Sequence, residues 1–300
     1  MKIQFFFLLF FSFISEAKTQ SLLPFTRDNL RLTNPAYYNS EKVLLNVSNT
    51  VSGLNSNFAT NTNFTYFQYG FRNFALSARS ISTYSSFYQN RDYGINAAYH
   101  LKITRKLSLF TGVGVNSVLS NFSFIPSKTE TMPSINAGII AFSRIGNVPI
   151  QLGVSMNSLN EPKFIRDGQK NGFQHIQLNF YGSAEFKIER KNDTTKYIKR
   201  HFYIIPSFNL QTLQFNEFNV SVLLKKNSVY GGLGITSGEY LAFLGYQFEN
   251  NWRVSSSIGM MRSKLDDNFF NSNLSANLRV MYQLNRRGCQ YRSRMFWNEL

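Results

Sequence analysis

The chain has 300 residues, of which 16% are charged and 16% are aromatic, and its formal net charge is +16 at pH 7. Ordinary globular domains contain about 25% charged residues, so the composition argues against a typical soluble enzyme. Few charges, many aromatic residues and abundant small polar residues are typical of a β-barrel with a lipid-facing outer surface. The single cysteine, Cys289, excludes an internal disulfide framework.

Residues 1–17 have the features of a cleaved signal peptide. Lys2 gives a basic start, the apolar stretch FFFLLFFSFI covers 5–14, and small residues surround Ala17 at the expected cleavage site. The apolar stretch is shorter than the roughly 20 residues that a membrane-spanning helix needs. We therefore expect a secreted chain that begins after Ala17. The alternative is a buried N-terminal core helix.

The stretch TNPAYYNS at 33–40 predicts a turn before the first strand. Pro35 fixes its own φ and biases Asn34 away from helix, so the chain can turn sharply and begin a strand at Glu41. We interpret 18–40 as an N-terminal periplasmic segment that leads into the wall at the periplasmic rim. The lead-in motif consists of Asn34, Pro35, Ala36 and Tyr37.

Alternation of apolar and polar residues recurs along 41–284. In DYGINAAYHLKI, for example, Tyr93 and Ile95 share one face and Gly94 and Asn96 the other. Alternation over about ten residues matches a transmembrane β-strand, whereas a strand of a soluble sandwich averages about five or six residues. The pattern predicts fourteen strands, near 41–51, 57–67, 69–79, 92–103, 106–118, 133–143, 148–158, 173–186, 201–211, 214–224, 227–236, 239–248, 251–261 and 272–284.

An even number of strands closes a barrel with both chain ends on one side and leaves no exposed sheet edge. Twelve and sixteen strands are the alternative counts. The links also alternate in length: short turns fall on the side that we assign to the periplasm, as in outer-membrane barrels. Longer links are expected on the other side, at 80–91, 119–132, 159–172 and 262–271.

These patterns predict an all-β, transmembrane, antiparallel up-and-down β-barrel over 41–284, followed by a basic C-terminal tail at 285–300. A soluble two-sheet sandwich is the alternative, but it does not predict the alternation in link length. The partners expected from the barrel pattern include the lipid of the outer membrane.

Basic residues gather at the turns assigned to the periplasmic end. This position favours contact with anionic lipid headgroups or an acidic periplasmic protein over nucleic-acid binding. The long turn at 187–200 and the tail at 286–294 carry the candidate contacts. These residues are Lys187, Arg190, Lys191, Lys196, Lys199, Arg200, Arg286 and Arg287.

The sequence predicts no catalytic, cofactor or metal site. Its three histidines, His100, His175 and His201, lack metal-ligand spacing. The glycine-rich stretches FTGVGVNS and YGGLGITSG lie inside alternating strands with no helix after them, which favours close packing in the lumen over phosphate binding. Aromatic residues at strand ends, such as Trp252, are typical of interfacial girdles. A barrel lipid hydrolase remains an alternative, and it would need Ser, His and Asn together on the outer surface.

Several stretches resemble the PorP/SprF family of outer-membrane proteins, which is associated with type IX secretion and gliding. They are TNPAYYNS before the first strand, MPSINAGIIAFS and VPIQLGVSMNSLNEPKF in the middle, and HFYIIPSFNLQ, LLKKNSVYGGLGI and LAFLGYQFENNWRVSSSIG later. The resemblance implies a 14-stranded barrel, related in architecture to fatty-acid transporter barrels, in the outer membrane of a Gram-negative bacterium. The chain departs from the family pattern in continuing past Leu284, which leaves the position of the assembly signal open.

The resemblance also implies contacts with periplasmic secretion proteins and with secreted surface cargo, and no catalytic residues. The leading hypothesis is therefore a non-enzymatic barrel that anchors or docks secreted proteins through the loops at 80–91, 119–132 and 159–172. The alternative is a transport barrel for hydrophobic or small solutes, with 18–40 as a partial plug.

Overall fold

In the part of the chain that the structure describes, 18 strands form a single β-sheet. The computed structural model describes residues 31, 33–37, 43–54, 59–86, 88–104, 106–122, 125–131, 133–166, 169–173, 176–188, 202–212, 217–248, 251–261 and 274–284. In this part of the chain no helix has the length and apolarity to cross a bilayer.

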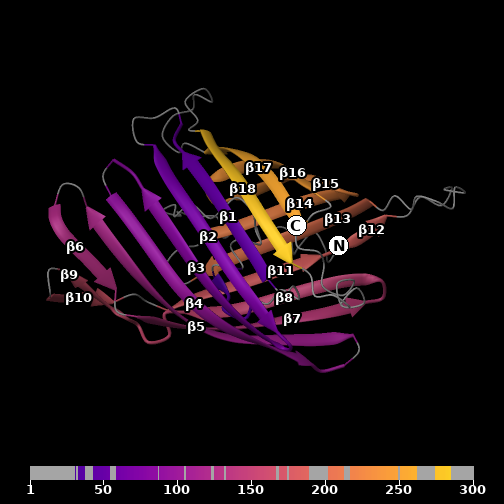
Figure 1. Cartoon of the computed structure of the whole chain (residues 1–300), viewed down its shortest axis with the longest axis horizontal. Helices are drawn as coiled ribbons and strands as arrows, with labels where there is room; N and C mark the ends of the chain where they lie inside the picture. Colours follow the sequence, from indigo (N-terminus) through magenta and orange to yellow (C-terminus); the bar gives the residue numbers. More distant parts are fainter. Residues whose placement is uncertain are drawn as a thin grey trace, which may run out of the picture.

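Fourteen of the strands form a closed antiparallel wall, which confirms the predicted barrel and its strand count. The wall strands are β1 (Val43–Ser52), β2 (Thr60–Phe71), β3 (Phe74–Tyr84), β4 (Tyr88–Lys102), β5 (Leu107–Phe122), β7 (Ser134–Ile145), β8 (Val148–Asn157), β11 (Gln177–Ala184), β13 (Phe202–Thr212), β14 (Glu217–Lys226), β15 (Val229–Thr236), β16 (Glu239–Gln247), β17 (Trp252–Met261) and β18 (Leu274–Leu284). β1 pairs with β18 from Val43 opposite Leu284 to Ser52 opposite Ser275, and this pairing closes the barrel (Figure 1).

Four shorter strands extend the wall. They are β6 (Ile125–Thr131), β9 (Lys163–Arg166), β10 (Gln169–Phe173) and β12 (Phe186–Ile188). β6 pairs with the end of β5, β9 with β6, and β10 with β9, so these three form a small sheet that stands beyond the wall (at the left of Figure 1). The predicted loops at 119–132 and 159–172 are therefore largely strand, whereas the predicted loop at 262–271 lies outside the described residues.

The prediction of a long loop at 80–91 is wrong. β3 runs to Tyr84 and β4 begins at Tyr88, with Tyr84 opposite Gln89. The apolar alternation stops earlier than the strand does, because the outward-facing residues of β3 become polar at Ser80.

The first hairpin turn also lies later than predicted. The sequence placed it near 68–70, but β2 continues to Phe71 and the turn consists of Arg72 and Asn73. Arg72 adopts a φ of 51°, a left-handed conformation that tight hairpin turns require. Gly70 is a strand residue and not a turn residue.

The two ends of the barrel differ in their links. At one end, called here the short-turn end, the hairpins β7–β8, β14–β15 and β16–β17 contain left-handed residues at Gly146, Asn227 and Asn251, with φ of 60°, 55° and 67°. The extra sheet of β6, β9 and β10 stands at the opposite end, called the long-loop end. In outer-membrane barrels the short turns face the periplasm.

Side chains alternate between an outer surface that is largely apolar and a lumen that is largely polar. On β1 the lumen-facing Leu44, Asn46 and Ser48 are buried, while Val47 is 44% exposed. Large outward residues reach exposed fractions of 68% at Ile95 and 69% at Leu233. A surface that is apolar outside and polar inside suits a barrel that is surrounded by lipid.

Aromatic rings gather on the outer surface at the short-turn end. Phe74 packs edge-on against Tyr99 with ring centroids 5.9 Å apart, and Trp252 packs against Tyr282 at 4.8 Å. These rings have the position and amphipathic character of an interfacial girdle.

Candidate functional site

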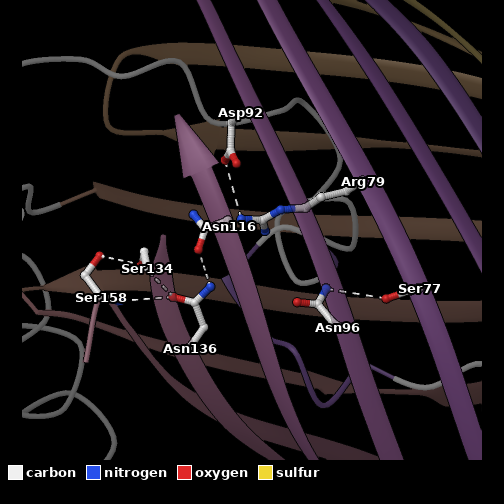
Figure 2. Close-up of polar contacts among 8 residues, drawn as sticks. All are labelled: Ser77, Arg79, Asp92, Asn96, Asn116, Ser134, Asn136 and Ser158. Carbon is white, nitrogen blue, oxygen red and sulfur yellow. Dashed lines mark hydrogen bonds and ion pairs between the residues drawn. The ribbon is translucent and has the colours of Figure 1, made fainter. Parts of the chain in front are cut away.

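The lumen wall carries a network of polar side chains (Figure 2). Asn136 on β7 donates a hydrogen bond to the Oδ1 atom of Asn116 on β5. The backbone N–H of Ser158 donates to Asn136 Oδ1 at 3.0 Å, and the Ser134 hydroxyl lies 3.3 Å from the same oxygen. These contacts join three neighbouring wall strands from the inside.

A partly buried ion pair lies beside this network. The Nη2 atom of Arg79 on β3 is 3.4 Å from Asp92 Oδ2 on β4, and the two side chains are 7% and 18% exposed (Figure 2). Asn96 donates to the Ser77 hydroxyl at 3.4 Å, nearer the short-turn end of the same two strands. The charges of Arg79 and Asp92 are thus neutralised inside the lumen.

Residues 33–37 lie inside the barrel, and not at its rim as the sequence interpretation placed them. Asn34, Ala36 and Tyr37 are 2%, 0% and 5% exposed. The backbone N–H of Tyr37 donates to the Asn34 carbonyl at 3.1 Å, and the N–H of Ala36 donates to Asn34 Oδ1 at 2.9 Å. This is a β-turn with asparagine at its first position and Pro35 at its second, where proline pre-sets the required φ.

Glycines of two adjacent strands make room for this turn. Gly112 on β5 lies opposite Gly138 on β7, and both face the lumen. A Cβ atom at Gly112 would lie 2.5 Å from the Cα of Ala36, and a Cβ at Gly138 would overlap Asn34 Oδ1. Only residues without a side chain allow the turn to lie this close to the wall. We call Gly112 and Gly138 the glycine cradle.

Hydrogen bonds to β7 and β8 fix the turn in the glycine cradle. Asn34 Nδ2 donates to the carbonyl oxygens of Val154 at 3.2 Å and Ile139 at 3.4 Å. The Ser155 hydroxyl donates to the Thr33 carbonyl at 2.6 Å. The Asn34 side chain therefore bonds to the turn with its oxygen and to the wall with its nitrogen.

Arg31 occupies an aromatic site on the other side of the turn. Its guanidinium carbon lies 5.2 Å from the ring centroid of Tyr37 and 5.8 Å from that of Tyr66 on β2, and its Nη2 atom donates to the Tyr37 hydroxyl at 3.2 Å. Arg31 is fully buried. Cation–π contacts in such a desolvated site are worth about 2 kcal/mol.

An apolar cluster in the lumen surrounds the same turn. Ala36 and Tyr37 belong to it, together with residues from wall strands around the barrel. The wall members are Leu44, Phe64, Tyr66, Phe110, Ile140, Tyr181 and Met281. The best-packed apolar part of the lumen is thus built around the N-terminal segment.

The structure describes one of the predicted basic contact residues. Lys187 is exposed on β12 at the short-turn end, opposite Tyr203 of β13. The other candidates lie outside the described residues. They are Arg190, Lys191, Lys196, Lys199, Arg200, Arg286 and Arg287.

Among the residues that the structure describes, no group of three or more His, Cys, Asp or Glu side chains could hold a metal ion. His100 faces the lumen and stacks on Phe110, with ring centroids 4.6 Å apart. His175, His201 and Cys289 lie outside the described residues.

Sequence reasoning placed the glycines of FTGVGVNS in lumen packing but did not find their contact with the N-terminal turn. It also missed Arg31, Gly138 and Ser155 as members of this site. The positions of two glycines are the feature that points to this site. Gly112 and Gly138 both lie on the lumen-facing side of their strands, and they pair with each other across the sheet.

Several solved structures are similar to the chain at low sequence identity. The toluene transporter TbuX of Ralstonia pickettii is 8% identical, with a TM-score of 0.49 over 86% of this chain and 94% of that chain. Omp33 of Acinetobacter baumannii is 10% identical, with a TM-score of 0.47 over 81% and 98%. The KdgM porin in complex with disordered oligogalacturonate is 10% identical, with a TM-score of 0.41 over 80% and 98%.

No curated protein matches the sequence. Residues 16–282, however, match the family described as type IX secretion system membrane protein PorP/SprF. The match covers the lumen turn and nearly the entire barrel wall. The chain therefore belongs to the PorP/SprF family of type IX secretion system membrane proteins and is an outer-membrane β-barrel.

Proposed function

We propose that this barrel holds secreted surface proteins at its long-loop end and contacts periplasmic secretion proteins at its short-turn end. Family membership supports a role in type IX secretion. The observation that carries the docking role is the small sheet of β6, β9 and β10, which extends β5 beyond the wall and offers a surface that the barrel itself does not need for closure (Figure 1).

The docking role is tested by removing this sheet. Replacing 119–131 and 159–175 each with Asn-Gly, which suits two-residue hairpin links, removes this sheet and the last four residues of β5 and keeps the other wall strands. We expect normal barrel levels in the outer membrane and loss of cargo from the cell surface. The matched control replaces 262–273 in the same way and should retain cargo. Full retention of cargo by the first variant would reject the docking role.

The periplasmic role is supported by the position of Lys187, which is exposed on β12 at the short-turn end. Reversing charge at the basic turn, with Lys187, Arg190, Lys191 and Lys196 all changed to Glu, should abolish co-purification of periplasmic proteins after crosslinking. Lys163→Glu, at the opposite end of the barrel, is the control. Unchanged co-purification in the charge-reversed variant would exclude this contact surface.

A second candidate function is transport of hydrophobic or small solutes, and it is favoured by the buried N-terminal segment. A segment held in the lumen by hydrogen bonds to Val154 and Ile139 could act as a plug that moves during transport. Solute uptake by the purified protein in liposomes tests this function. Uptake would support transport, and its absence together with cargo loss in the loop variant would support the docking role alone.

A further inference from the structure

The lipid-facing surface has an almost uniform apolar composition at one level of the wall. Counting from the short-turn end of each strand, the seventh residue faces outward in most strands. In nine of these it is a large apolar residue: Val113, Ile139, Val154, Leu178, Phe208, Val220, Ile235, Ile258 and Leu278. A strand rises about 3.3 Å per residue, so at a tilt of about 40° this level lies about 15 Å above the short-turn end, inside an apolar band about 25 Å tall.

Three consecutive strands break this rule. The seventh residue is Asn49 on β1, Thr65 on β2 and Ser80 on β3. Asn63 faces outward between its neighbours Asn49 and Ser82, with which it pairs directly. We call this surface the polar notch. Its members are Asn49, Asn61, Asn63, Thr65, Ser80 and Ser82.

The polar notch is exposed and partly hydrogen-bonded. Asn61, Asn63 and Thr65 are exposed. Asn49 Nδ2 donates to Asn61 Oδ1 at 2.9 Å and to Asn63 Oδ1 at 2.7 Å. Both bonds use the side-chain oxygens of Asn61 and Asn63, and their amide N–H groups are donors for which hydrocarbon offers no acceptor.

The chemistry of the notch is neutral. None of its six members is charged, whereas recognition of phosphate groups of lipids relies on Arg and Lys. Amide and hydroxyl groups both donate and accept hydrogen bonds, so such a surface is complementary to another copy of itself. A second copy of the chain also lies at the same depth in the membrane, which places one notch level with the other.

We propose that the polar notch of β1–β3 is a dimer interface, on which a second copy of this barrel docks about a two-fold axis parallel to the membrane normal. In a closed dimer of two barrels inserted in the same orientation the two-fold axis is parallel to the membrane normal, and the contact is isologous. Asn63 then lies near the axis, facing the Asn63 of the second copy. This interface is independent of which cargo or periplasmic protein the barrel binds.

Disulfide crosslinking in native outer membranes tests the interface. In a Cys289→Ser background, Asn63→Cys should give a disulfide-linked homodimer on mild oxidation. Val154→Cys, five strands away around the wall and at the level of the seventh residue, is the matched control and should stay monomeric. Equal crosslinking at both positions, no crosslinking at Asn63→Cys, or a crosslink from Asn63→Cys to a different protein would each overturn the proposal.

A second variant tests the hydrogen-bonding chemistry. Asn49→Leu, Asn61→Leu and Asn63→Leu together make the notch apolar, and we expect loss of the dimer with retention of folded, heat-modifiable monomer in detergent. A folded triple variant that still dimerises like the wild type would overturn the proposal. Should the triple variant fail to fold, the crosslinking of Asn63→Cys, a single substitution, decides the question.

Discussion

Asn34 donates a hydrogen bond from its side-chain nitrogen to the carbonyl oxygen of Val154, 3.2 Å away, although 120 residues separate the two. The side chain of Val154 faces the lipid, so Asn34, inside the barrel, bonds only to the backbone carbonyl of this residue. The N-terminal turn is thus held by main-chain carbonyl groups of the wall and by the Ser155 hydroxyl. It fits there because Gly112 and Gly138 have no side chains.

Gly112→Ala should displace the N-terminal turn. The added Cβ would lie 2.5 Å from the backbone of Ala36, and such overpacking costs about 1–3 kcal/mol. The measurement is the rate at which a water-soluble maleimide labels Ala36→Cys in a Cys289→Ser background, and we expect the rate to rise in Gly112→Ala. Gly234→Ala is the control, because a Cβ there meets its nearest atom at 3.3 Å.

Asn34→Ala should destabilise the barrel. It removes the hydrogen bonds to Val154 and Ile139 and that from the Ala36 N–H, and a buried unsatisfied group costs about 1–3 kcal/mol. Urea unfolding of the protein in lipid vesicles measures the change. Asn73→Ala, at an exposed hairpin turn, should change the free energy of unfolding by less than about 0.5 kcal/mol.

Asp92→Asn should cost more stability than removal of both charges. The substitution leaves the guanidinium of Arg79 buried without its carboxylate, a change of about 3 kcal/mol. The double variant Arg79→Met with Asp92→Leu replaces the pair with apolar groups and should recover most of that loss. A double variant no more stable than Asp92→Asn alone would show that the ion pair itself holds β3 to β4.

Ile139→Arg should destabilise folding into a bilayer far more than Ile145→Arg does, although both residues are exposed on β7. Arginine at the middle of the bilayer costs about 2–4 kcal/mol and near the interface about 0–1 kcal/mol. Ile139 is the seventh residue from the short-turn end, whereas Ile145 is the first. The free energies of folding into bilayers of the two variants provide the measurement, and equal values would place the membrane elsewhere on the wall.

The sequence was sufficient to predict the wall of the barrel, because alternation reports directly which face meets lipid. It failed at 80–91, where the outward residues of β3 become polar from Ser80 while the backbone pairing continues to Tyr84. Hydrophobic periodicity measures contact with lipid and not the length of a strand.

The lumen site could be predicted only in part. The Asn34-Pro35 turn follows from local backbone preferences, but its position depends on main-chain groups of β7 and β8, which no side-chain pattern reports. The sequence assigned Gly112 of β5 to lumen packing. That Gly138 lies opposite Gly112, and so shares in the site, can be recognised only once the strand register is known.

The most direct test of the central claim is the amount of secreted surface protein displayed by cells with and without this gene. We expect display to fall sharply in the deletion strain and to return when the wild-type chain is supplied. Cargo should then be recovered from inside the deletion cells or from the medium. Normal display in the deletion strain, with no second barrel of this family present, would contradict a role in secretion.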